Sequence, residues 1–182
     1  DSYIGGAAVV AQHLKEAGAD VTFTTILGND ELKNFVIKTF KEKKIKLNPI
    51  IISSRPTTSK NVIIAGDHRI LKVDKVDNQP INKIIIEKIC SIIKKVKSDC
   101  VVLSDFRHGI FNNLTMPKFL EVAKTKKFKV ADSQVASRWG NISDFSKKLP
   151  GGLFGFININ SLVLSVISDN IFSGLNFKSL SS

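Results

Sequence analysis

The chain has 182 residues, of which 43% are hydrophobic and 24% are charged, and its formal net charge is +11. This length and balance are typical of a globular domain with a core of its own, and they exclude a largely disordered chain. The positive charge is compatible with nucleic acid, an anionic membrane surface or an anionic substrate, so it selects no partner by itself.

Strand and helix patterns alternate along the first 131 residues. In chain order, the sequence predicts a helix over 6–17, a strand over 21–27, a helix over 31–43, strands over 45–52, 60–65 and 69–73, a helix over 82–97, a strand over 100–103, a helix over 116–124 and a strand over 129–131. Gly18 suits a left-handed helix end, and Gly66-Asp67 is a hairpin signal. The alternation predicts an α/β domain with a mainly parallel sheet and a small β appendage.

The residues from about 149 onward differ from the rest. They are rich in Gly, Asn, Ser, Phe and Leu, only Asp169 and Lys178 carry charge, and the apolar residues follow no clear period. Polar residues at 158, 160 and 161 argue against a transmembrane helix. We therefore predict a body over 1–148 and an atypical tail over 149–182, which is either a poorly formed end or a segment foreign to the fold.

The lysines gather in polar stretches such as 41–44, 94–97 and 124–127. Such stretches are typical of solvated helix faces and ends, and no aromatic residues interleave them as a base-stacking surface requires. We therefore expect no nucleic-acid binding. Cys90 and Cys100 lack metal-ligand spacing, and residues 1–20 lack the pattern of a secretory signal. Buried free thiols in a reducing cytoplasm, and no metal site, are the expectation.

Three segments carry residues suited to chemistry. Gly5-Gly6 before the first helix leaves room for a ligand beside free backbone N–H groups, although tight packing explains such a pair equally well. Arg55 and Lys60 frame a loop with two threonine hydroxyls and offer cations to an anionic substrate; an exposed loop before an edge strand is the alternative. Asp105 follows the apolar run over 100–103, where ligands bind in open α/β sheets. His108 nearby is either a base or, more often for a lone histidine, structural.

Taken in order, these motifs resemble the ribokinase-like, or PfkB-type, carbohydrate kinases. The resemblance spans roughly residues 4–146 and rests on Gly-Gly-Ala-Ala at 5–8, Leu-Gly-Asn-Asp-Glu at 27–31, Arg-Pro-Thr-Thr at 55–58 through Lys60, Leu-Lys-Val-Asp at 71–74, Leu-Ser-Asp-Phe at 103–106 through Gly109, and Ala-Asp-Ser-Gln at 131–134. The third to fifth motifs resemble in particular the branch that phosphorylates heptose 7-phosphate, the kinase domain of ADP-heptose synthases.

The resemblance implies a ribokinase-like fold in which the region of about 45–75 contributes a lid over the sugar site. It implies ATP- and Mg²⁺-dependent phosphoryl transfer to a sugar or sugar phosphate by a cytoplasmic enzyme. Gly5 and Gly6 would line the sugar, Arg55 and Lys60 would hold an anionic group, and Asp105 would bind hydroxyls. The open edge of the lid also suggests a homodimer.

Departures from the family pattern limit what the chain itself can do. Val9 stands where a sugar-binding Asn is common, and Lys72 replaces an Arg in the lid. The Gly-Ala-Gly-Asp motif that supplies the anion hole and the catalytic base is absent, as is a Pro-Asn strand after Phe145. We therefore expect a truncated kinase fragment that lacks the C-terminal catalytic half and is inactive as it stands. A non-catalytic sugar-binding or regulatory module is the alternative.

Overall fold

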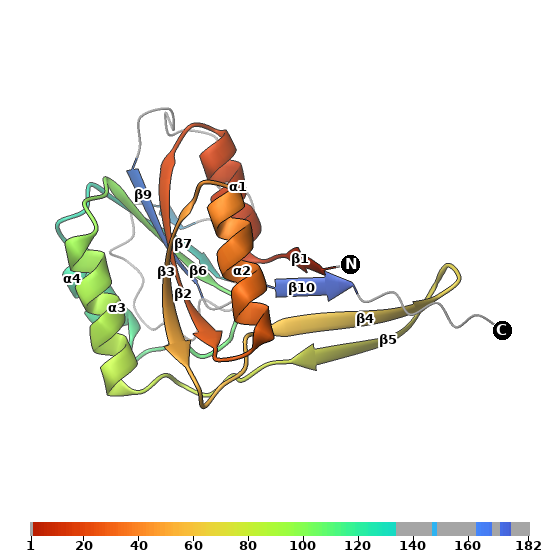
Figure 1. The fold of residues 1–182 in the computed structure, drawn as a ribbon. Coiled ribbons are helices and arrows are strands. Elements are labelled where there is room, and N and C mark those ends of the chain that lie inside the picture. Colours follow the sequence, from red (N-terminus) through yellow and green to blue (C-terminus); the bar gives the residue numbers. More distant parts are fainter. Residues whose placement is uncertain (1, 134–146, 149–162, 169–171, 176–182) are drawn as a thin grey trace.

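The structure is a computed structural model, and it describes residues 2–133, 147–148, 163–168 and 172–175. Two sheets and four helices make up this part of the chain (Figure 1). The helices are α1 (Ala7–Glu16), α2 (Glu31–Glu42), α3 (Lys83–Lys95) and α4 (Met116–Val122). The strands are β1 (Ser2–Ile4), β2 (Asp20–Gly28), β3 (Lys46–Ile52), β4 (Ser59–Ala65), β5 (His68–Lys75), β6 (Cys100–Asp105), β7 (Phe128–Ser133), β8 (Lys147–Lys148), β9 (Val163–Ser168) and β10 (Phe172–Leu175).

The larger sheet is parallel and has the strand order β3-β2-β9-β6-β7-β8. The chain runs outward from β2 to β3 on one side of β9, and from β6 through β7 to β8 on the other. The order therefore changes direction at β9, and ligands of open α/β sheets bind at such a switch point, beyond the carboxyl ends of the strands. Gly28 and Asp105 end β2 and β6 at that edge.

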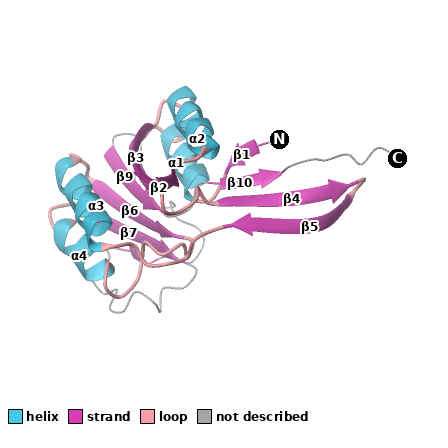
Figure 2. Cartoon of the chain, turned by 60° about the horizontal axis from the view of Figure 1, so that its bottom comes forward, coloured by secondary structure: helices cyan, strands magenta, loops and turns pink. Residues whose placement is uncertain are grey.

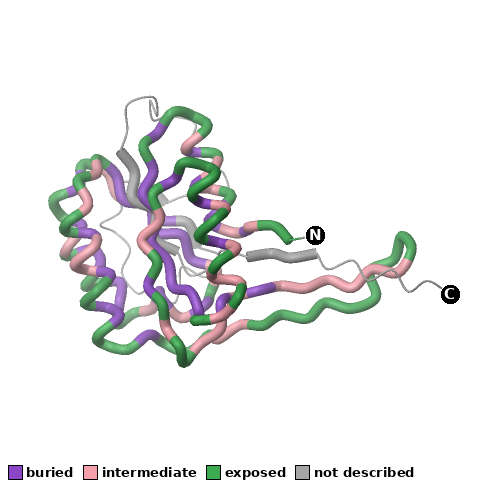
Figure 3. Tube along the Cα trace, in the orientation of Figure 1, coloured by how far each residue is buried: buried purple, intermediate pink, exposed green. Residues whose placement is uncertain are grey.

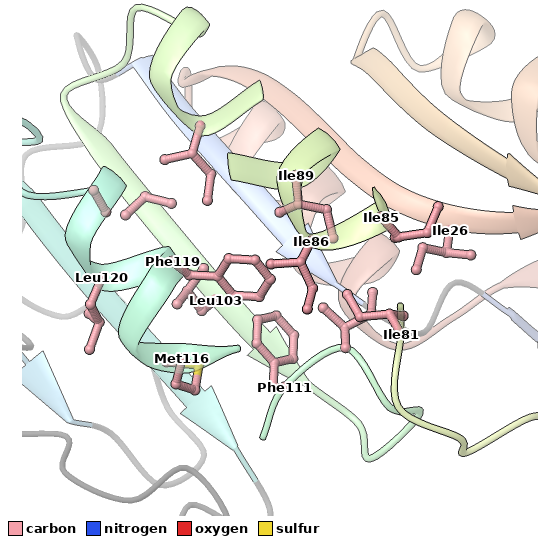
Figure 4. Packing of buried hydrophobic residues seen from close by; sticks show 14 of the residues in the cluster. Ile26, Ile81, Ile85, Ile86, Ile89, Leu103, Phe111, Met116, Phe119 and Leu120 are labelled. Atoms are coloured by element: carbon pink, nitrogen blue, oxygen red, sulfur yellow. The ribbon is translucent and has the colours of Figure 1, made fainter. Parts of the chain in front are cut away.

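Helices cover both faces of this sheet, α1 and α2 on one and α3 and α4 on the other (Figure 2). The side chains of a strand alternate between faces, so β6 serves both cores. Val101 and Leu103 pack with α3 and α4, while Cys100 and Val102 pack with α1 and α2. In this core, Phe119 of α4 and Phe111 of the loop before α4 meet edge to face, with their ring centroids 6.0 Å apart (Figure 4).

Local signals explain where the helices begin and end. The side chains of Asp30 and Asn82 cap α2 and α3 by accepting hydrogen bonds from the backbone N–H groups of Lys33 and Ile85. Gly18, just beyond α1, has a φ of 98°, as the sequence predicts for a left-handed end.

The smaller sheet has the order β1-β10-β4-β5. Its strands β4 and β5 form a long hairpin that projects from the body (Figure 1). We call β4 and β5 with their two-residue turn, residues 59–75, the lid hairpin. Ala65 pairs with His68, so Gly66-Asp67 forms the turn as predicted. The lid range predicted from residue 45 takes in β3, which belongs to the larger sheet instead. β5 is exposed along its whole length (Figure 3).

Other features differ from the expectation as well. Both cysteines are free, but only Cys100 is buried; Cys90 is half-buried because it lies at the margin of the apolar face of α3. Burial raises the pKa of the Cys100 thiol to about 12. β9 and β10 come from the range in which the sequence pattern predicts no element, and the proposed division at residue 148 stays a prediction. No helix in the described ranges is long and apolar enough to cross a membrane.

Candidate functional site

The candidate site lies where the lid hairpin leaves the carboxyl edge of the larger sheet. Two segments connect the hairpin to the body: residues 53–58, which we call the first foot, and residues 76–81, the second foot. The loop after β6, residues 106–110, lies against both feet through hydrogen bonds and close contacts. The site is therefore built from three loops that follow β3, β5 and β6.

Asp105 is the last residue of β6 and is buried. Its Oδ1 accepts a hydrogen bond of 2.7 Å from the backbone N–H of Arg107. Arg107 has a φ of 73°, an uncommon conformation for a long side chain, and the carboxylate of Asp105 helps to hold it. The sequence thus correctly places a carboxylate at the carboxyl end of a buried strand, and the following turn is folded around that carboxylate.

Lys60 is half-buried near the start of β4, opposite Asp74 in the lid hairpin. Its ammonium makes no hydrogen bond or ion pair with the part of the chain that the structure describes. Its charge nevertheless acts on His108 in the loop after β6. Lys60 and Asp105, predicted from separate motifs, therefore both influence the same imidazole electrostatically.

His108 is buried, and its Nδ1 lies 2.8 Å from Oδ1 of Asn78 in the second foot. Burial lowers the pKa of His108, and the positive charge of Lys60 lowers it further, against the opposing effect of Asp105. These effects therefore favour the neutral form of the imidazole over the charged one. Burial and the contact with Asn78 favour the structural interpretation of this histidine over a role as base.

Arg55 lies in the first foot, and its side chain is only 10% exposed. Its guanidinium contacts Asp77, the carbonyl of Gln79 and the carbonyl of His108. These partners are missing from the sequence-based site, because two of the three contacts are to backbone carbonyls, which leave no signature in a sequence. The Asp77 carboxylate also accepts from the backbone N–H of Gln79, a local turn that Asp often forms.

Asp30 and Thr57 fix the first foot to the end of β2. The Asp30 carboxylate accepts from both the backbone N–H and the hydroxyl of Thr57, and the Thr57 hydroxyl accepts from the N–H of Gly28. Burial acts to raise the pKa of Asp30, but the hydrogen bonds from Thr57 and Lys33 outweigh it, so the pKa lies below its ordinary value. The two motifs at 27–31 and 55–58, separate in sequence, thus form one structural unit.

Gly5 and Gly6 lie where β1 of the smaller sheet leads directly into α1. Gly5 is buried, and Gly6 precedes α1 with a φ of 54°. Position 6 therefore favours glycine on conformational grounds. Asp132 and Ser133, from another predicted motif, end β7 beside Ser104 and Asp105, and Gln134 lies outside the described residues.

Comparison with known proteins gives a consistent result. The family model described as pfkB family carbohydrate kinase matches residues 2–148. A "Bifunctional protein HldE" from Sulfurimonas denitrificans is 34% identical over 110 residues, which cover 59% of this chain and 23% of that protein. A protein of the same name from Campylobacter jejuni subsp. doylei is 31% identical over 150 residues, which cover 81% of this chain and 30% of that protein. The chain thus spans about a quarter of the length of these curated relatives.

Two solved structures have the same fold. A protein from Clostridium perfringens assigned as a sugar kinase superposes with a TM-score of 0.60 at 19% identity, over 79% of this chain and 46% of that one. The tetrameric inhibited form of phosphofructokinase-2 from Escherichia coli superposes with a TM-score of 0.54 at 12% identity, over 71% and 42%. The predicted fold class, a ribokinase-like α/β fold, is confirmed, and the chain spans less than half the length of either solved structure.

Proposed function

The chain belongs to the pfkB family of carbohydrate kinases, and on that premise we propose that it forms the sugar-binding part of an ATP-dependent kinase acting on a sugar phosphate similar to heptose 7-phosphate. The relatives named HldE and the motifs at 55–60, 71–74 and 103–109 support this choice of acceptor. The site lies at the switch point of the sheet, with the lid hairpin beside it. In this role the chain binds and orients the acceptor for phosphoryl transfer.

One observation carries the proposal: the two feet of the lid hairpin, which bears Lys60, contact the loop that follows Asp105. Lys60 comes from the lid and Asp105 from the end of β6, and both act on His108. A carboxylate accepts hydrogen bonds from sugar hydroxyls, and an ammonium without a partner among the described residues suits a phosphate. Gly5 and Gly6, at the junction with the smaller sheet, are proposed to line the sugar. The predicted role of Arg55 as an anion ligand stays a prediction, and its contacts favour another role.

Membership of a kinase family implies ATP and Mg²⁺. Among the described residues, no group of three or more His, Cys, Asp or Glu side chains is arranged to hold a metal ion. Neither group is therefore assigned to a residue of this chain. Dependence on ATP, with the free thiols Cys90 and Cys100, supports a cytoplasmic location.

The test is phosphorylation by the full-length gene product, measured as ATP consumption with a panel of neutral sugars and heptose phosphates. We expect turnover on a sugar phosphate, and we expect Lys60→Ala to raise KM for that acceptor about tenfold or more. Lys38→Ala, which removes an exposed lysine on α2, is the matched control and should leave KM unchanged. Sugar binding without turnover would instead identify a non-catalytic module.

We also propose that two copies pair through the lid. β5 is an edge strand, and it exposes Ile70, Leu71 and Val73, of which Ile70 is 64% exposed. An exposed apolar edge of this length favours pairing with another strand. Analytical ultracentrifugation should find a dimer that Ile70→Lys weakens, whereas a monomer at every concentration would contradict the proposal.

A further inference from the structure

The guanidinium of Arg55 contacts three protein groups. Nε lies 3.4 Å from Oδ2 of Asp77, Nη2 donates to the carbonyl of Gln79 at 2.6 Å, and Nη1 donates to the carbonyl of His108 at 3.4 Å. Asp77 and Gln79 belong to the second foot of the lid hairpin, and His108 belongs to the loop after β6. A single side chain in the first foot thus joins all three loops of the site.

The second foot and the loop after β6 are also packed tightly against each other. A Cβ at Gly109 would lie 2.1 Å from the carbonyl oxygen of Gln79, and Gly109 has a φ of 87°. The N–H of Ile81 donates to the carbonyl of Gly109, and Asn78 contacts the imidazole of His108. Arg55 therefore fastens the first foot to the second foot and to the loop after β6. That loop begins directly after Asp105.

We propose that Arg55 is a positioning residue that locks the base of the lid hairpin to the loop carrying Asp105, and that Lys60, not Arg55, meets the anionic group of the acceptor. The inference rests on the proposed function for the identity of the ligand. The planar guanidinium presents its donors in a fixed fork that matches three acceptors in different directions. Lys60 contrasts with it, because its ammonium has no partner among the described residues.

The proposal predicts that charge alone does not replace Arg55. Arg55→Lys keeps the cation but loses the fork, so it should behave like Arg55→Gln. Asp77→Asn breaks the same fastening from the other foot and should produce a similar effect. The double variant Arg55→Gln/Asp77→Asn should be no worse than Arg55→Gln alone, since Arg55→Gln already removes the ion pair with Asp77.

Two readouts on the full-length protein test this. Amide hydrogen exchange across residues 59–81 should rise about tenfold in the Arg55 and Asp77 variants while exchange in α3 stays unchanged. KM should rise by the same factor for neutral and phosphorylated acceptors, with kcat less affected. Lys60→Ala should leave amide exchange unchanged and should raise KM for phosphorylated acceptors alone. If Arg55→Gln does not fold, Arg55→Lys provides the same comparison.

The proposal is overturned if Arg55→Gln leaves amide exchange in the lid hairpin unchanged. It is also overturned if Arg55→Gln raises KM for phosphorylated acceptors alone and Arg55→Lys restores the original KM. A uniform rise in exchange over the whole chain would also overturn it, since that is the behaviour of a purely structural residue. If no acceptor is phosphorylated, the proposed function fails, and the exchange measurement still decides whether Arg55 fastens the lid.

Discussion

Thr57 holds both carboxylate oxygens of Asp30. Its backbone N–H donates to Oδ2 at 2.8 Å and its hydroxyl donates to Oδ1 at 2.7 Å, while the hydroxyl oxygen accepts from the N–H of Gly28 at 2.9 Å. Asp30 also caps α2. The end of β2, the start of α2 and the first foot of the lid hairpin are therefore joined by one buried hydroxyl and one carboxylate.

Thr57→Val should destabilise the protein by about 3 kcal/mol. The substitution removes a hydrogen bond to a carboxylate and leaves the buried N–H of Gly28 without its acceptor. Thr57→Ser should retain most of the stability, because it keeps the hydroxyl. Thr58→Val, one residue along the same foot, is the matched control. Urea unfolding at neutral pH gives the comparison, and equal losses for Thr57→Val and Thr58→Val would contradict this assignment.

Gly28→Ala should destabilise the protein although the backbone conformation of Gly28 is an ordinary one. A Cβ there would lie 2.4 Å from the backbone nitrogen of Thr57 and 2.7 Å from both the Arg55 carbonyl oxygen and the Asp30 carboxylate. We expect a loss of about 2 kcal/mol or more, typical of overpacking. Gly66→Asn in the lid turn is the comparison. That site is open, and Asn tolerates a positive φ, so its thermal midpoint should change little.

Ile93→Ala and Ile84→Ala separate the two sides of α3. Ile93 is fully buried against the sheet, and its truncation should cost about 2–5 kcal/mol through lost burial and the resulting cavity. Ile84 is 69% exposed on the same helix, so its truncation should change the free energy of unfolding by less than about 0.5 kcal/mol. Similar losses at both positions would show that α3 does not pack in this orientation.

Stability should fall as the pH drops below about 6.5 because of His108. Burial and the nearby Lys60 and Arg107 lower its pKa in the folded protein, against the opposing charges of Asp105 and Asp74. As the pH falls, the imidazole is therefore protonated in the unfolded chain before it is protonated in the folded protein. The free energy of unfolding decreases as the pH falls from about 6.5 toward the lower pKa of the folded state. His108→Gln should reduce the dependence of the free energy of unfolding on pH, and His68→Gln on exposed β5 should not. Urea titrations between about pH 7.5 and 5.5 measure it.

The central strand and the lid were predictable because their signals are local. The continuous apolar run at 100–103 indicates a strand covered on both faces, and its residues do alternate between the two cores. Gly66-Asp67 between two β-rich runs fixes the hairpin turn. By contrast, nothing local identifies β9. Its position depends on pairing with β2 and β6, which are far away in sequence, and such pairings cannot be deduced from the pattern of one segment.

The same distinction holds for the site. Asp105 and Lys60 are predicted from their place at a strand end and a strand start, and both charges act on the pKa of His108. The contacts of Arg55 are not predictable, because its partners Asp77, Gln79 and His108 lie more than 20 residues away and two of the three contacts are to backbone carbonyls. A cation in a polar loop has the same sequence signature whether it binds a ligand or braces the protein.

Strand β9 pairs on both sides within the sheet, yet it is the last of the six described strands of that sheet to be synthesised. On the ribosome, β2 and β6 emerge well before the strand that separates them. The nascent chain can form its helices and the lid hairpin early, but the native strand order must wait until residue 168 has left the exit tunnel. Until then, the facing edges of β2 and β6 lack their partner, and unpaired edges of this kind are sites at which chaperones act and aggregation begins.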